Sequence, residues 1–208
     1  LYIKNLKYKS SQLIQIQDNY LSEFSYITNN EKIFYFYTDR DAPNFSLISL
    51  NINNLNEWSY IIPEKENVLR VSSAGKYFFA NYLIDAKSQI EQYDLKGELV
   101  REVALLGIGS AGGFYAKKDE SELYYTFSSY IYPTTIFNYD IEKGVSTLYE
   151  KPNVAFDYDD YISEQVFFSS KDSLKIPMFL TYKKSIEKDG KNPTILYGYG
   201  GFNISLTP

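Results

Sequence analysis

The 208-residue sequence contains no cysteine and no histidine, and each absence removes a class of chemistry. Without cysteine there is no disulfide framework, no thiolate metal site and no cysteine nucleophile. Without histidine, neither a Ser-His-Asp triad nor a His-ligated zinc site can be completed within these residues. Positive charge is also scarce, since 21 Lys and Arg face 26 Asp and Glu, for a net charge of −5. Nucleic acid is therefore not an expected partner.

Long apolar runs are missing too. None approaches the roughly 18–20 residues that would span a bilayer, so no membrane partner is expected. The sequence begins at Leu1 and its only methionine is Met178, from which we expect a segment of a longer protein. The lack of cysteine fits a reducing cytoplasm, which is the expected location. A signal peptide elsewhere in the longer protein would make the periplasm the alternative.

Aromatic residues, by contrast, are abundant. The sequence has 22 Tyr, 14 Phe and 1 Trp, or 18 % aromatic residues, and these types favour β-strands. Aromatic-rich runs begin at residues 33, 77 and 123. They recur about every 45 residues, which is the spacing of β-propeller blades. Because one meander cannot cover both of its apolar faces, neighbouring sheets are expected to stack.

Each repeat is predicted to hold four short strands. The predicted ranges are 23–28, 33–37, 47–52 and 58–62, then 68–73, 77–82, 90–95 and 99–106, then 113–116, 123–130, 136–141 and 145–149. Residues 1–6 and 12–17 match the third and fourth strands of a preceding repeat. The sequence therefore predicts about 3.5 blades of a propeller, in a mainly β protein.

The pattern changes after about residue 150. A hairpin is predicted over 164–182, with a turn at 170–173. Residues 193–198 (PTILYG) are predicted to form a short buried strand that runs into a glycine-rich loop, as at the edge of an α/β sheet. The expected domains are a β-propeller segment over 1–155 and the start of an α/β domain over 156–208.

Two motifs are better explained as connections than as sites. Residues 107–112 satisfy G-x-G-x-x-G, but no helix is predicted after them to hold a pyrophosphate. We interpret them as an inter-blade connection, with Ser110 structural because Ile108 stands where a nucleophile elbow needs glycine. We interpret the second motif, 39–41 (Asp-Arg-Asp), as a turn between two strands. The alternative is that it contacts a ligand over the propeller mouth.

The acidic positions are also interpreted structurally. Asp94 and Asp140 recur at one place in the repeat, as turn-forming residues do. Asp157, Asp159 and Asp160 form the densest carboxylate cluster. Their spacing does not match a calcium loop, so a solvated connection is favoured over a cation site or a glycosidase acid pair.

The segment 192–208 (NPTILYGYGGFNISLTP) is the strongest candidate for chemistry. Glycine lets the backbone approach a ligand closely. A phenol held on such a loop can donate a hydrogen bond to a developing oxyanion. A tight turn packed by aromatic rings fits the composition equally well.

Three stretches resemble the prolyl oligopeptidase (prolyl endopeptidase) family: YGYGGFNISLTP at 197–208, SKDSLKIPMFLTYKK at 170–184 and TDRDAPNFSLISLNI at 38–52. The resemblance covers nearly the whole chain. It implies a seven-bladed propeller that covers the active site of an α/β-hydrolase domain and admits only short peptides. It also implies a serine-type endopeptidase that cleaves on the carboxyl side of proline through a Ser-His-Asp triad.

Two residues carry over from this resemblance. Tyr199 matches the family's oxyanion tyrosine, and Phe202 matches the aromatic wall of its proline pocket. No triad residue is expected in this chain, so these 208 residues are expected to be inactive alone. The implied partners are short proline-containing peptides and the remainder of the same polypeptide. No metal or organic cofactor is implied, and the lack of acidic groups in the loop favours proline over arginine specificity.

Two other functions are kept open by the residues themselves. A propeller arc rich in tyrosine suits a non-catalytic binding module for peptides or sugars. A propeller glycosidase would use the carboxylates of Asp157, Asp159 and Asp160.

Overall fold

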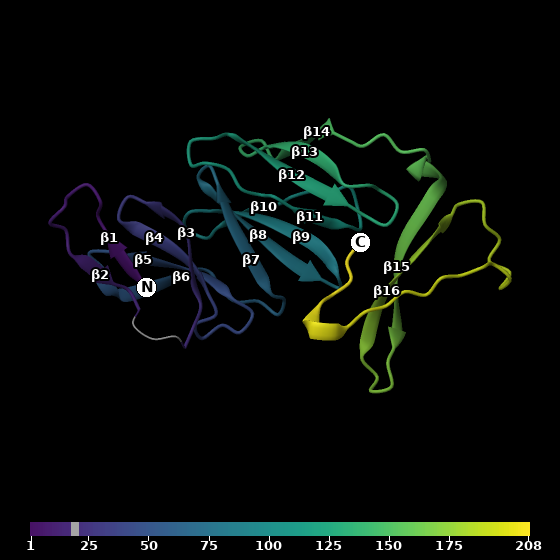
Figure 1. Cartoon of the computed structure of the whole chain (residues 1–208), viewed down its shortest axis with the longest axis horizontal. Helices are drawn as coiled ribbons and strands as arrows, with labels where there is room; N and C mark the ends of the chain where they lie inside the picture. Colours follow the sequence, from purple (N-terminus) through teal and green to yellow (C-terminus); the bar gives the residue numbers. More distant parts are fainter. Residues whose placement is uncertain (18–20) are drawn as a thin grey trace.

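A computed structural model describes residues 1–17 and 21–208. Its regular structure is almost entirely antiparallel β-sheet: three four-stranded sheets lie between a short strand pair and a long hairpin (Figure 1). No α-helix forms in the described residues, which contain only the 3-10 turns η1 (Tyr158–Asp160) and η2 (Gly201–Asn203). Within the same ranges, no helix is long and apolar enough to cross a membrane.

The three sheets are consecutive meanders whose strands pair in chain order. They consist of β3 (Phe24–Asn30), β4 (Ile33–Thr38), β5 (Ser46–Asn51) and β6 (Asn54–Ile62), then β7 (Leu69–Ala74), β8 (Tyr77–Ile84), β9 (Lys87–Asp94) and β10 (Leu99–Glu102), then β11 (Ser110–Gly112), β12 (Glu122–Ser128), β13 (Thr135–Asp140) and β14 (Val145–Glu150). The predicted repeat of four-stranded units is confirmed. The strands β1 (Tyr2–Lys4) and β2 (Leu13–Gln15) form the predicted partial unit before them.

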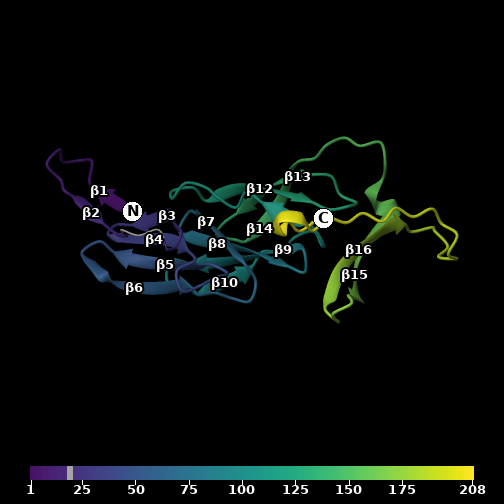
Figure 2. The same cartoon turned by 60° about the horizontal axis from the view of Figure 1, so that its bottom comes forward.

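The sheets stack face to face because their strands alternate between two apolar surfaces (Figure 2). In β12, Leu123, Tyr125 and Phe127 are buried, whereas the intervening Tyr124 is 49 % exposed. The buried rings pack against side chains of β8 and β9 in one cluster. Full burial of such a side chain contributes about 1.5–3 kcal/mol, so the stacked faces stabilise the arc.

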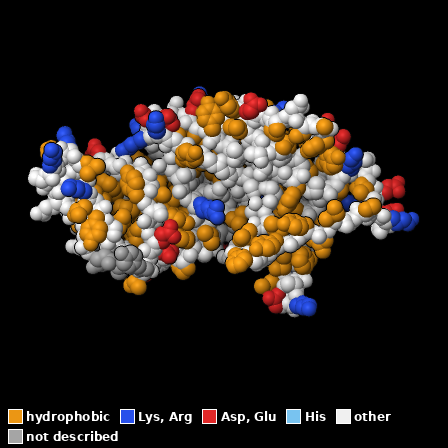
Figure 3. Space-filling view, viewed as in Figure 1, with side chains coloured by type: hydrophobic (Ala, Val, Ile, Leu, Met, Phe, Trp, Pro, Cys, Tyr) orange, Lys and Arg blue, Asp and Glu red, His pale blue; other side chains and the backbone are white. Residues whose placement is uncertain are grey.

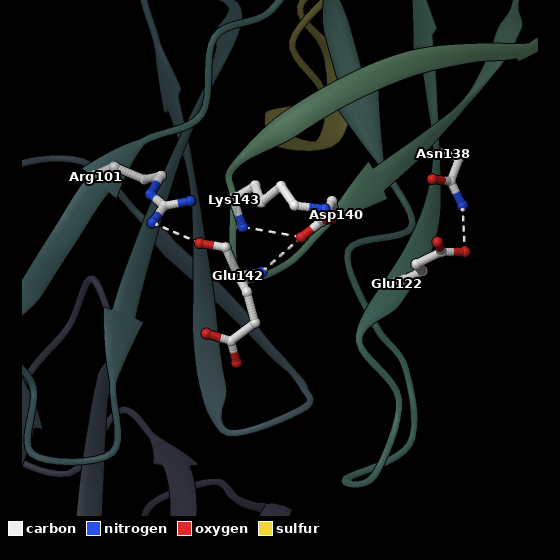
Figure 4. A network of polar contacts seen from close by, with 6 residues as sticks. All are labelled: Arg101, Glu122, Asn138, Asp140, Glu142 and Lys143. Carbon is white, nitrogen blue, oxygen red and sulfur yellow. Dashed lines mark hydrogen bonds and ion pairs between the residues drawn. The ribbon is translucent and has the colours of Figure 1, made fainter.

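The turn between the third and fourth strands is built alike in two sheets. The Asp94 carboxylate accepts hydrogen bonds from the backbone N–H groups of Lys96 and Glu98, at 2.8 and 2.9 Å. The Asp140 carboxylate accepts equivalent bonds from residues 142 and 143, at 3.1 and 2.9 Å (Figure 4). The interpretation of both residues as turn-forming acids is confirmed.

A glycine of each of these turns lies against the preceding sheet. Gly97 has φ +87°, and a Cβ there would lie 2.0 Å from the carbonyl oxygen of Ile61. Gly144 has φ +72°, and a Cβ there would lie 2.0 Å from the Arg101 guanidinium, which donates to the Glu142 carbonyl at 3.0 Å (Figure 4). Both turns therefore require glycine for two reasons: the backbone has a positive φ, and the neighbouring sheet leaves no room for a Cβ.

A buried carboxylate joins the first inter-sheet connection to the second sheet. Lys65 Nζ lies 2.6 Å from Glu91 Oε2, which also accepts a hydrogen bond from the Tyr93 hydroxyl, while Gln89 donates to Oε1 at 3.1 Å. Burial by itself would raise the pKa of the Glu91 carboxyl, but the hydrogen bonds from Lys65 and Tyr93 outweigh it and lower the pKa below its ordinary 4.5. The stabilisation is therefore complete above pH 4.5 and is lost as the pH falls through the lowered value.

Replacing Lys65 with methionine should lower the free energy of unfolding by about 1–3 kcal/mol at pH 7, because it leaves the Glu91 carboxylate buried without its cation. Lys143→Met is the matched control. Lys143 pairs with Asp140 on the surface and its side chain is 77 % exposed, so its loss should destabilise the protein much less than the loss of Lys65. Denaturant unfolding at pH 7 and pH 3 measures the free energy of unfolding of both variants. The difference in this free energy between Lys65→Met and Lys143→Met should be smaller at pH 3. Equal losses at pH 7 would refute the assignment.

Two strand predictions in the second and third sheets need correction. The first strand of the third sheet is not 113–116 but β11, where Ala111 pairs with Phe127. Residues 113–116 instead pass to the neighbouring sheet, where the Ala116 N–H donates to the Ser73 carbonyl at 3.2 Å. The strand predicted over 99–106 ends at Glu102. No helix follows Gly112, in agreement with the rejected dinucleotide motif.

The predicted hairpin is confirmed as β15 (Tyr161–Ser169) and β16 (Lys175–Lys183). The strand predicted over 193–198 is wrong, since those residues form no regular element, and Ile195 and Leu196 are 93 % and 85 % exposed. A strand needs a neighbouring strand to bond, and no described strand lies in register with this segment. The start of an α/β-hydrolase domain over 156–208 therefore stays a prediction.

Candidate functional site

The glycine-rich loop follows an extended segment that returns from the hairpin toward the sheets (Figure 1). Tyr199 and Phe202 flank the pair Gly200 and Gly201, so the structure brings both predicted site residues into one loop. The Tyr199 side chain is 51 % exposed and that of Phe202 is 95 % exposed. Neither side chain is sealed in a core formed by the described residues.

The loop backbone explains how these side chains are presented. A Cβ at Gly201 would lie 2.7 Å from the Tyr199 hydroxyl oxygen, so the tyrosine ring folds over the glycine. Phe202 has φ 54° and ψ 33°, a left-handed conformation that costs a non-glycine residue about 1–2 kcal/mol. The Ile204 N–H closes the turn on the Gly201 carbonyl at 3.1 Å. A phenol fixed in this way can donate to an oxygen that approaches the loop.

The segment before the loop lies near the third sheet. Tyr130, in the connection between β12 and β13, has its pKa raised by burial and further by the nearby Tyr197 hydroxyl. The Tyr130 ring also lies 5.6 Å from the ring of Phe179 in β16, measured between centroids. The connection, the hairpin and the approach to the loop therefore meet in one region.

A hollow of about 420 Å³ lies at the seam between the third sheet and the hairpin, and its lining includes Tyr132, Tyr158, Tyr161, Asp159 and Lys184. Its residues come from distant segments, so sequence periodicity could not reveal it. Figure 3 shows apolar side chains in a band where Figure 1 places the hairpin and the C-terminal segment. The hollow is aromatic, with one carboxylate and one amine in its lining.

The remaining sequence candidates have structural roles. Asp157 caps η1 by accepting a hydrogen bond from the Asp159 N–H at 2.9 Å, and the three acidic residues of this turn are exposed. Asp39 accepts from the Glu23 N–H at 2.7 Å, which ties its turn to β3. Ser110 lies in β11 with its hydroxyl buried. Across residues 1–17 and 21–208, no group of three or more Asp or Glu is arranged to hold a metal ion.

Comparison with known proteins gives a consistent result. The family model described as "Prolyl oligopeptidase, N-terminal beta-propeller domain" matches residues 1–152. The prolyl endopeptidase of Elizabethkingia miricola is 49 % identical over 210 residues, which cover 100 % of this chain and 30 % of that protein. The prolyl endopeptidase of Dictyostelium discoideum is 36 % identical, over 91 % of this chain and 27 % of that protein.

Solved structures agree. Apo prolyl oligopeptidase B from Galerina marginata superposes with a TM-score of 0.88 at 29 % identity, over 100 % of this chain and 31 % of that one. A structure from a study of two prolyl endopeptidases, concerned with inter-domain dynamics in their catalysis and specificity, has a TM-score of 0.82 at 33 % identity. It covers 99 % of this chain and 30 % of that one. The chain thus spans about 30 % of the length of the relatives it matches.

Proposed function

The chain belongs to the prolyl oligopeptidase family, and from this membership we propose that it is part of a serine peptidase that hydrolyses short peptides on the carboxyl side of proline. Relatives that it matches over most of its length are named prolyl endopeptidases, which supports the activity and the substrate class. Because the chain spans about 30 % of those proteins, the activity belongs to the whole protein.

In this proposal residues 156–208 begin the α/β-hydrolase domain, and residues 1–155 form part of a seven-bladed propeller that restricts access to short peptides. The chain has no histidine, so the Ser-His-Asp triad depends on residues outside it. The stacked four-stranded sheets and the family match support the propeller assignment. No metal or organic cofactor enters the reaction.

The observation that carries the proposal is the glycine-rich loop. Tyr199 is half exposed, its ring folds over Gly201 where a Cβ would lie 2.7 Å from the hydroxyl oxygen, and its residue type and position match the family's oxyanion tyrosine. As the serine attacks the peptide carbonyl, negative charge develops on the carbonyl oxygen. The phenol hydroxyl donates a hydrogen bond to that oxygen, beside a backbone N–H next to the nucleophile.

Phe202 forms the aromatic wall for the substrate proline in this proposal. A flat apolar ring suits pyrrolidine, which has no charge or donor to pair. Phe202→Ala should lower the ratio of kcat/KM for a Gly-Pro amide to that for the matching Gly-Ala amide by about tenfold, the size expected for losing one apolar contact in a pocket. An unchanged ratio would remove Phe202 from the pocket.

A fluorogenic peptide series tests the proposed function itself. The whole protein should hydrolyse a Gly-Pro amide at least about tenfold faster than a Gly-Ala or Gly-Arg amide. Binding of the Gly-Pro peptide without turnover would favour the non-catalytic propeller module. Hydrolysis of a glycoside, abolished by replacing Asp157, Asp159 and Asp160, would favour the glycosidase.

A further inference from the structure

One cross-strand pair of the hairpin contacts two different sheets. Gln165 in β15 and Phe179 in β16 are paired residues, so their side chains lie on the same face of the hairpin. Gln165 reaches the turn between β8 and β9 of the second sheet, and Phe179 reaches the connection between β12 and β13 of the third. Figures 1 and 2 both place the hairpin beside the end of the second sheet.

The Gln165 amide uses both of its ends in this contact. Its Nε2 donates to the Asp85 carbonyl at 2.6 Å, and its Oε1 accepts from Lys87 Nζ at 3.0 Å. Gln165 and Lys87 are both partly buried. An amide that donates and accepts at once can be replaced by neither a carboxylate nor an alkyl chain without losing a bond.

The turn that receives Gln165 is strained. Asp85 and Ala86 have φ of 49° and 63°, although neither residue is glycine. This is the backbone of a tight type I′ hairpin turn, which glycine or asparagine would adopt at lower cost. The turn presents the Asp85 carbonyl to Gln165 Nε2 and Lys87 Nζ to Gln165 Oε1, so the turn and the amide form one complementary unit.

The second contact leads to the candidate site. Phe179 packs on Tyr130 with a centroid separation of 5.6 Å, and the Tyr197 hydroxyl lies close enough to Tyr130 to raise the pKa of its phenol beyond the effect of burial. Tyr197 precedes Tyr199 by two residues. The face of the hairpin that carries Gln165 therefore also packs on the connection between β12 and β13.

We propose that Gln165 is a positioning residue whose side-chain amide holds the β15–β16 hairpin against the propeller, and so sets the size of peptide that the enzyme accepts. This inference rests on the proposed peptidase function. We call the contact of Gln165 with the Asp85 carbonyl and Lys87 the clasp, and when it is closed, long peptides are excluded. When it is broken, the hairpin separates more readily from the sheets.

The test uses the whole protein with Gln165→Ala, Lys87→Met and the double variant. Loss of the clasp should raise the rate on a 30-residue proline peptide relative to that on a proline tetrapeptide by about tenfold, the equivalent of one or two hydrogen bonds. The double variant should behave like Gln165→Ala, which already removes both bonds, whereas Lys87→Met keeps the bond to the Asp85 carbonyl and should have a smaller effect. Ser169→Ala at the tip of the hairpin is the control and should leave the ratio unchanged.

Hydrogen exchange tests the clasp independently of the proposed peptidase function. Gln165→Ala should speed exchange of the β15–β16 amides about tenfold and leave β7–β9 unchanged. Unchanged hairpin exchange overturns the clasp, whether or not the protein is a peptidase. If exchange is faster but the ratio of the rate on the 30-residue peptide to that on the tetrapeptide is unaltered, the positioning role is overturned. If no peptide is turned over by the unmodified protein, the proposed function fails while the exchange result still decides the coupling.

Discussion

Replacing Tyr199 with phenylalanine should lower kcat of the whole protein on a Gly-Pro amide by about 10²–10³, with a much smaller change in KM. The substitution removes one hydroxyl and keeps the ring, so the loop backbone and the packing over Gly201 are retained. The loss falls on kcat because the phenol bonds more strongly to the charged oxygen of the transition state than to the neutral carbonyl of the substrate.

Tyr197→Phe provides the matched control. Tyr197 is two residues away in the same segment and is 77 % exposed. Its loss should change kcat by less than about threefold, since it makes no bond to the developing oxyanion. A drop below about threefold for Tyr199→Phe, or equal drops for the two variants, would refute the assignment. Both assays follow release of the fluorogenic amine under substrate saturation.

The second large effect is on stability. Gly97→Ala should lower the free energy of unfolding by about 2–4 kcal/mol, because it adds overpacking against the Ile61 carbonyl to the cost of a left-handed alanine. Gly190→Ala supplies the comparison. Gly190 has a similar φ of +80° but no atom within 4 Å of the added methyl, so only the backbone cost of about 1–2 kcal/mol remains.

Denaturant unfolding of the three proteins measures this difference. The excess loss in Gly97→Ala over Gly190→Ala reports the contact between the first and second sheets. Gly144→Ala should fall between them, since the methyl meets the Arg101 side chain, which can swing away at the cost of its bond to the Glu142 carbonyl. Equal losses for Gly97→Ala and Gly190→Ala would show that the sheets separate to admit the methyl group.

The sequence predicts the sheets well where a strand is long and alternates. In β12 the buried Leu123, Tyr125 and Phe127 are separated by polar or exposed positions, and this period of two is readable without a structure. β11 was misplaced because a three-residue strand of Ser, Ala and Gly has no such pattern and is defined by pairing with β12. Residues 193–198 have the composition of a strand, but a strand also requires a bonding partner.

The candidate site was predicted differently from the fold. Tyr199 and Phe202 were identified from the resemblance of their loop to a known family, since no periodicity marks them. The clasp at Gln165 was not predicted, because its partners lie 78 and 80 residues away in the sequence and all three residues are ordinary polar types. The seam hollow was missed for the same reason, as its lining comes together only in three dimensions.

Hairpin turns usually tolerate inserted residues, but the turns that contain Gly97 and Gly144 should not. Short turns elsewhere accept extra residues, tags or grafted loops with little penalty. Here the tips after β9 and β13 sit against a neighbouring sheet, so an insertion would wedge the two blades apart. In a library that places a short insertion at every position, these two tips should be depleted as strongly as core strands, while the tip between β15 and β16 should remain permissive.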